Sequence, residues 1–172
     1  TIGWPDLYDT VNGNETKCDL PGCFSLMAYG PYNNGSRTPP ALSILERWMM
    51  GWAEPEILQS TGEYSLPAIT EGKGYLIKTE VDGDYFLLEC RGAGKNEWDK
   101  KEYLDYYKQG ADCGLLIYHV RNETNSWISN KVNTSRGNEH YKIFYSNPDS
   151  KNGYAPQYLP DHCFFPGASN VT

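Results

Sequence analysis

The sequence predicts an α+β protein in which a loop-rich part with one long helix is followed by a mostly antiparallel β-rich region. Three observations indicate this class. Residues 1–37 are rich in Gly, Pro, Asn and Asp, and apolar residues then recur every three or four positions over 39–52. From residue 62 onward, short runs of β-branched and aromatic residues are separated by turn residues. We therefore divide the chain into 1–55 and 56–172, which should pack as one unit.

One long helix is predicted over residues 39–52. Thr38 is a candidate N-cap, and Gly51 is a candidate terminator. The apolar side chains form one stripe that should pack inward, with Trp48 and Trp52 against the sheet. The stripe comprises Leu42, Leu45, Trp48, Met49 and Trp52.

Five short strands are predicted in the second part of the chain. They are the runs EYSLPAI, GYLIKTE, YFLLECR, GLLIYHVR and HYKIFYS, in this order along the sequence. The Asp82-Gly83-Asp84 turn predicts that the second and third runs pair as an antiparallel hairpin. A short helix is expected around residues 97–108.

The composition of the chain bears on its binding partners and on the cellular compartment in which it acts. The net charge is −7, with no run of Lys or Arg, which argues against a nucleic-acid partner. The apolar runs are too short to span a membrane. Five Asn-x-Ser/Thr sequons are more than chance predicts, which favours a secreted or cell-surface protein.

Two short motifs together indicate a zinc peptidase site. In zinc peptidases with an HExxH helix, a glycine lets the chain leave the helix and a third ligand follows, as in HExxHxxGxxD. Gly3-Trp4-Pro5-Asp6 has the form of that GxxD, a pattern that is common by chance when it occurs alone. Ser25–Tyr29 reads SLMAY, the form of the methionine turn that lies beneath the zinc ligands in metzincins.

Six blocks of the sequence together resemble the immune-inhibitor-A-like secreted zinc metallopeptidases. They are GWPDLYDT, FSLMAYG, TPPALSILERWMMGWAEP, YFLLECR, GLLIYHV and FFPGASNVT. The family typically reads HExxHxxGxPDxYD, a Met-turn, TPPxLSxxxKxxLGW, YFLIExR, GLLIWHxD and FPG, in the same order and spacing. The resemblance covers nearly the whole chain, but Arg121 stands where the family often has the Asp of WHxD.

The resemblance implies a fold and a set of roles. Residues 1–55 would be the C-terminal subdomain of a metzincin-like catalytic domain, in a secreted zinc endopeptidase acting on a protein or peptide. Asp6 would be the third zinc ligand, Met27 the Met-turn residue, and Tyr29 would lie near the metal, where it can stabilise an oxyanion. The alternatives are that Asp6 is a turn residue capping a local amide, Met27 ordinary core and Tyr29 a packed aromatic.

The sequence contains no HExxH. We therefore expect the two histidines and the catalytic glutamate to come from an N-terminal half of the catalytic domain that is missing here, and this chain alone to be inactive. The alternative function is a noncatalytic β-rich module that binds protein or glycan through exposed aromatic residues.

The remaining candidate ligands carry weaker signals. His119 lies on the strand GLLIYHVR, where it is expected to be a satisfied core or strand-edge histidine. His140 and His162 match no ligand spacing with each other or with His119. Asp9 and Asp161, with loop carbonyls, are candidates for a structural calcium ion, although no EF-hand pattern supports them.

Overall fold

A computed structural model of the 172-residue chain gives the fold. It describes residues 3–11, 20–92, 98, 114–135, 137–149 and 160–166. The short helix expected around residues 97–108 lies outside the described residues, apart from Trp98.

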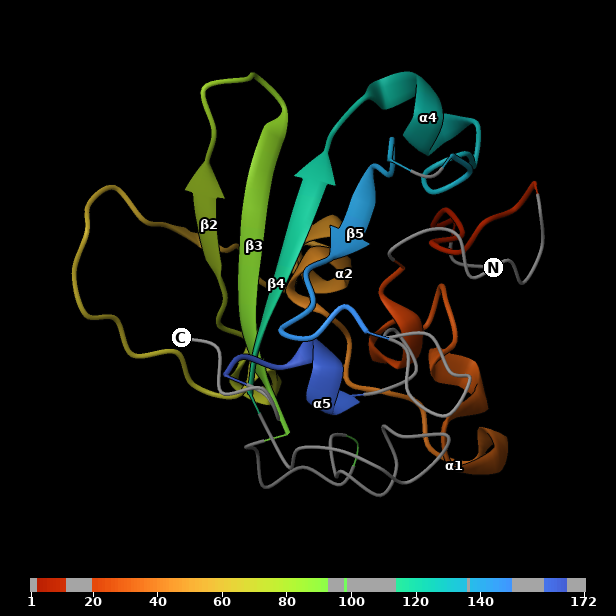
Figure 1. Cartoon of the computed structure of the whole chain (residues 1–172), viewed down its shortest axis with the longest axis horizontal. Coiled ribbons are helices and arrows are strands. Elements are labelled where there is room, and N and C mark those ends of the chain that lie inside the picture. The colour runs from red at the N-terminus through yellow and green to blue at the C-terminus, as the bar shows by residue number, and fades with distance from the viewer. Residues whose placement is uncertain are drawn as a thin grey trace.

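One five-stranded mixed sheet forms the centre of the fold, with the strands in the order β1-β2-β3-β4-β5 (Figure 1). The first strand pairs in parallel with the second, and the other three pairings are antiparallel, so the sheet is mostly antiparallel as predicted. The hairpin expected at Asp82-Gly83-Asp84 is also confirmed, because it joins β2 to β3. The strands are β1 Glu56–Ile57, β2 Tyr75–Lys78, β3 Asp84–Arg91, β4 Gly114–Arg121 and β5 Tyr141–Ile143.

The predicted strand EYSLPAI is wrong, and β1 was not foreseen. Residues 63–69 form no regular strand; Ala68 makes an isolated bridge to Cys90, and Ile69 begins the 3-10 helix η3, Ile69–Glu71. Pro67 within the run cannot donate to a ladder, which disfavours a paired strand there. β1 has only two residues, both exposed, so it leaves no alternating pattern in the sequence.

The helices are all short, and the long helix predicted over residues 39–52 is wrong. Among the described residues the longest helix is α2, with six residues. None of the helices in this part of the chain is long and apolar enough to cross a membrane. The helical elements besides η3 are η1 Gly22–Phe24, η2 Gly30–Tyr32, α1 Asn33–Ser36, α2 Ile44–Met49, α4 Thr124–Ile128 and α5 Pro160–Cys163.

A capping box sets the start of α2. Its N-cap is Ser43 and not Thr38, because the Ser43 side chain accepts a hydrogen bond from the Glu46 amide while the Glu46 carboxylate accepts one from the Ser43 amide. Gly51 ends the helical region in a left-handed conformation, as predicted.

The predicted apolar stripe is only partly correct. Leu45 is buried, and the Trp48 ring packs edge-on against Tyr85 of β3 with centroids 5.9 Å apart. Met49 is exposed and Trp52 is 64% exposed, so neither packs inward. Trp52 follows the left-handed Gly51, where the helical period that generated the stripe has already ended.

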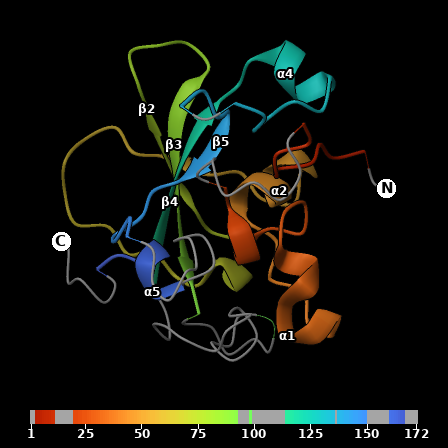
Figure 2. The ribbon, with the colours of Figure 1, turned by 45° about the vertical axis from the view of Figure 1, so that its right-hand side comes forward.

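The core lies between the sheet and the segments that precede it in the chain. Alternate residues of β3 and β4 point inward, as expected for strands with one covered face. Figure 2 shows α2 and the N-terminal segments gathered on one side of the sheet. The buried apolar cluster includes Leu7, Phe24, Ile44, Leu87, Leu116, Tyr118, Val120, Tyr141, Ile143 and Phe164.

Candidate functional site

The two motifs that suggest a zinc peptidase lie side by side. The Leu7 amide, directly after Asp6, donates a hydrogen bond of 2.7 Å to the Met27 carbonyl. This bond joins the GxxD segment to the SLMAY turn across twenty residues of sequence. A candidate ligand and a candidate Met-turn are therefore in backbone contact.

The Asp6 carboxylate is held by a residue from the far end of the chain. Asn130 Nδ2 donates to Asp6 Oδ2 at 2.8 Å, and Asn130 Oδ1 accepts a hydrogen bond from the Asp6 amide. In Figure 1 the red N-terminal segment accordingly passes beside the teal loop that follows α4. Asp6 is only partly buried, and its carboxylate interacts with Asn130 and with the Tyr8 hydroxyl.

One tyrosine, Tyr8, interacts with this carboxylate, and two more lie in the SLMAY turn and just after it. The Asp6 charge, partial burial, a hydrogen bond to Asp6 and the nearby Tyr32 together raise the pKa of the Tyr8 phenol. Tyr29 and Tyr32 have ring centroids 6.0 Å apart. Tyr8 thus interacts with Asp6 itself, whereas Tyr29, the residue singled out from the sequence, packs against Tyr32.

Met27 lies at the base of the turn. Its side chain is partly buried and packs against the hydrophobic core, and its amide donates to Ser25 Oγ at 3.1 Å. An apolar floor and an ordinary core residue would both show this packing, so it does not separate the two interpretations.

A buried carboxylate from α2 holds the same turn. Glu46 Oε1 accepts hydrogen bonds from Ser25 Oγ at 2.8 Å and from the Leu26 amide at 3.1 Å. Burial raises the pKa of Glu46, although its hydrogen bonds and Arg91 oppose the shift. Glu46 therefore both caps α2 and holds the SLMAY turn by hydrogen bonds.

A buried ion pair in β3 supports the turn from the sheet. Glu89 Oε1 accepts from Arg91 Nε at 2.8 Å and from the Tyr118 hydroxyl at 2.9 Å. Glu89 Oε2 accepts from the Ile44 amide at the start of α2, at 2.6 Å. The Arg91 guanidinium also donates to the Phe24 carbonyl, directly before the turn. The blocks YFLLECR, TPPALSILERWMMGWAEP and FSLMAYG are thus connected by buried hydrogen bonds.

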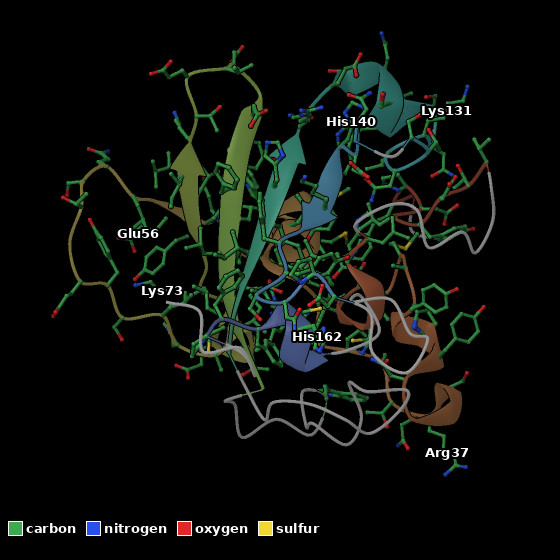
Figure 3. The ribbon with its side chains drawn as sticks, in the orientation of Figure 1. Arg37, Glu56, Lys73, Lys131, His140 and His162 are labelled. Carbon is green, nitrogen blue, oxygen red and sulfur yellow. The ribbon has the colours of Figure 1, made fainter. Side chains whose placement is uncertain are left out.

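Each of the three histidines has a partner other than Asp6. His119 Nε2 is 2.6 Å from Asp84 Oδ1 and its ring stacks on Phe86, which confirms a satisfied histidine, on the half-covered outer face of β4. His140 Nε2 is 3.4 Å from Glu123 Oε2. His162 Nδ1 is 2.9 Å from the Asp149 carbonyl oxygen. Figure 3 shows His140 near α4 and His162 on α5.

The residues present fit one ligand of a metal ion and not a whole metal site. Among the described residues, no group of three or more His, Cys, Asp or Glu side chains is placed to hold a metal. Asp6 offers an oriented carboxylate that keeps further acceptor capacity beyond the Asn130 bond. For calcium, Asp9 is buried and its Oδ1 accepts from the Val11 amide, and the side chain of Asp161 lies outside the described residues.

Comparisons of the chain with protein-family models, with curated proteins and with solved structures find no match.

Three contributors to the site were missed from the sequence. Tyr8 could have been found, because it is two residues after Asp6 and alternate residues of an extended segment share a side. Asn130 carries no sequence signal that links it to Asp6, which is 124 positions away. The pairing of Glu89 with Arg91 is visible as two charges at inward positions of a strand, which is an unusual place for charges unless they are paired.

Proposed function

We propose that this chain is part of a secreted zinc-dependent endopeptidase and supplies the third metal ligand and the methionine turn of its active site. The single observation that carries the proposal is the Leu7–Met27 backbone bond of 2.7 Å, which brings the candidate ligand segment onto the candidate Met-turn. The order of the six family-like blocks along the sequence supports it.

Each residue has a specific part in this proposal. The Asp6 carboxylate binds the metal, held by Asn130 on its Oδ2 side. Met27 contributes an apolar floor, and the Glu46 carboxylate keeps the turn in place through Ser25 and Leu26. Tyr29 donates a hydrogen bond to the substrate oxygen on which negative charge develops.

The rest of the chemistry comes from outside this chain. Asp6 would hold a zinc ion as one of its ligands, and the ion would supply Lewis acidity and lower the pKa of a bound water. The sequence holds no HExxH, and in this proposal the two histidines and the general base belong to an N-terminal half of the catalytic domain. This chain alone is accordingly inactive in the proposal.

The test uses the polypeptide encoded with its upstream region. Zinc content is measured by elemental analysis, and hydrolysis is measured on an unstructured protein substrate, for the wild type, Asp6→Ala and Asp82→Ala. Asp82 is an exposed carboxylate in the β2–β3 turn and serves as the matched control. Asp6→Ala should lose zinc and activity, whereas Asp82→Ala should keep both. Unchanged zinc stoichiometry and turnover in Asp6→Ala would refute the proposal and leave the binding-module alternative.

A further inference from the structure

Three of the Asn-x-Ser/Thr sequons lie within the described residues, and they start at Asn34, Asn122 and Asn133. Asn133 is fully buried and its side-chain amide donates to two backbone carbonyls, so a sugar on this nitrogen is incompatible with the fold. Asn34 is half-buried, and its amide donates to the Thr38 hydroxyl at 2.9 Å. Asn122 is exposed, and its side chain makes no hydrogen bond to the described residues. Asn122 therefore offers the most accessible amide nitrogen of the three.

The fold holds Asn122 at the end of a strand. It directly follows β4, and its backbone amide donates to the Gly83 carbonyl in the β2–β3 turn at 2.7 Å. Thr124, the hydroxyl residue of the sequon, is exposed and begins α4. Figure 1 shows this position at the upper end of the sheet, where the teal chain leaves β4 for α4. A sequon on a surface loop is the position at which an exported protein accepts an N-linked glycan.

An aromatic cleft of about 330 Å³ is lined in part by Asn122. Its other lining side chains are uncharged, and they are Leu45, Trp48, Met49, Tyr85 and Trp127. The Trp127 indole N–H is already used, because it donates to the Arg121 carbonyl at 2.8 Å. The Tyr85 hydroxyl makes no hydrogen bond to the described residues, and burial raises the pKa of this phenol to about 12. The cleft thus combines aromatic surfaces with a hydroxyl group that the described residues leave unused.

A sugar ring has the chemistry that this cleft would recognise. The C–H groups on one face of the ring pack against aromatic rings, and its hydroxyl and acetamide groups form hydrogen bonds with a phenol. An N-acetylhexosamine carries no charge, in agreement with the uncharged lining. A sugar attached to Asn122 is also tethered at the cleft, so its effective concentration there is high even when its intrinsic affinity is weak.

We propose that Asn122 carries an N-linked glycan whose first sugar occupies the cleft between Trp48, Tyr85 and Trp127. In this modification Asn122 Nδ2 forms a bond to the anomeric carbon of an oligosaccharide carried on a lipid diphosphate. The bond from that carbon to the phosphate oxygen breaks, the lipid diphosphate leaves with the electron pair, and the amide nitrogen loses one proton to a base of the host transferase. The inference rests on the export of the protein in the proposed function and not on its zinc site.

The modification is tested in the polypeptide encoded with its upstream region and secreted from a eukaryotic host behind a cleavable leader. Peptide mass spectrometry measures the glycan at Asn122. Thr124→Ala removes the sequon and keeps Asn122, and Thr124→Ser is the matched control because it keeps the sequon. We expect the glycan in the wild type and in Thr124→Ser, and its loss in Thr124→Ala. An unmodified Asn122 in the secreted wild type would overturn the inference, whereas the proposed function fails separately, through the zinc content of Asp6→Ala.

The place of the first sugar is tested by thermal unfolding after an endoglycosidase has trimmed the glycan to that sugar. Tyr85→Phe removes the hydroxyl and keeps the ring. In the trimmed protein this change should lower the unfolding midpoint by about 2 °C, because a hydrogen bond to the sugar is lost. In the Thr124→Ala background it should leave the midpoint unchanged or raise it, since the hydroxyl has no sugar partner to lose. Equal shifts in the two backgrounds would overturn the placement of the sugar in the cleft.

Discussion

Arg91 is expected to be the most sensitive position in the described core. Its side chain is fully buried and donates from Nε to Glu89, from one terminal nitrogen to the Ala41 carbonyl at 2.7 Å, and from the other to the Phe24 carbonyl. Arg91→Met replaces the charged side chain with an apolar one that is also unbranched. It leaves the Glu89 carboxylate without its counter-charge and removes the hydrogen bonds that Arg91 donates to the Ala41 and Phe24 carbonyls.

The expected cost follows from these three losses. Removing one partner of a buried ion pair costs about 3–5 kcal/mol, because the remaining charge stays buried. Each hydrogen bond lost from a buried carbonyl adds about 1–3 kcal/mol, part of which solvent entry and apolar packing by Met recover. Arg91→Met should therefore lower the free energy of unfolding by about 4 kcal/mol or more, a large fraction of the ~5–15 kcal/mol typical of a domain.

Urea unfolding followed by tryptophan fluorescence measures this cost. Lys78→Met is the matched control, since Lys78 is an exposed cation on β2 and should cost less than about 1 kcal/mol. Glu89→Gln combined with Arg91→Met should cost less than the sum of the two single changes, because no uncompensated charge remains. A loss in Arg91→Met no larger than that of Lys78→Met would refute the argument that the network supports the turn.

Three further predictions concern the same region. Gly30→Ala would place a Cβ against the Ser25 carbonyl oxygen and the Pro40 ring, and should lower the free energy of unfolding by about 1–3 kcal/mol. Gly62→Ala is the control and should be nearly neutral, because the nearest atom to its Cβ would be 3.5 Å away. Chemical denaturation measures both. Asn133→Asp removes the donors to the Leu7 and Tyr141 carbonyls and should cost about 3 kcal/mol or more in the same assay, and a neutral result would contradict the bonds observed. Because burial raises the pKa of Glu46, the folded state favours the protonated form of this side chain. The free energy of unfolding of the wild type should therefore fall relative to that of Glu46→Gln as pH rises above the ordinary carboxyl range. Parallel curves of stability against pH for the two proteins would disprove this.

The sequence by itself determined the features that depend on neighbouring residues. Short runs of β-branched and aromatic residues, separated by turn residues, located β2 to β5, and the Asp82-Gly83-Asp84 turn determined the pairing of β2 with β3. Gly51 marked the end of a helix, because the residue at that position is left-handed and glycine adopts this conformation readily. The GxxD and SLMAY motifs were also readable, because each lies within a few consecutive residues.

Only the tertiary structure decided the features that depend on distant partners. The capping box of Ser43 and Glu46 is itself a local pattern, but the bond from Ser25 of the SLMAY turn to Glu46 spans 21 positions and depends on packing. Asn130 reached Asp6 from 124 residues away. A polar side chain has many possible partners along a chain, and burial selects the one that leaves no donor or charge unsatisfied. That selection is made when the segments pack together, so no local pattern of the sequence records it.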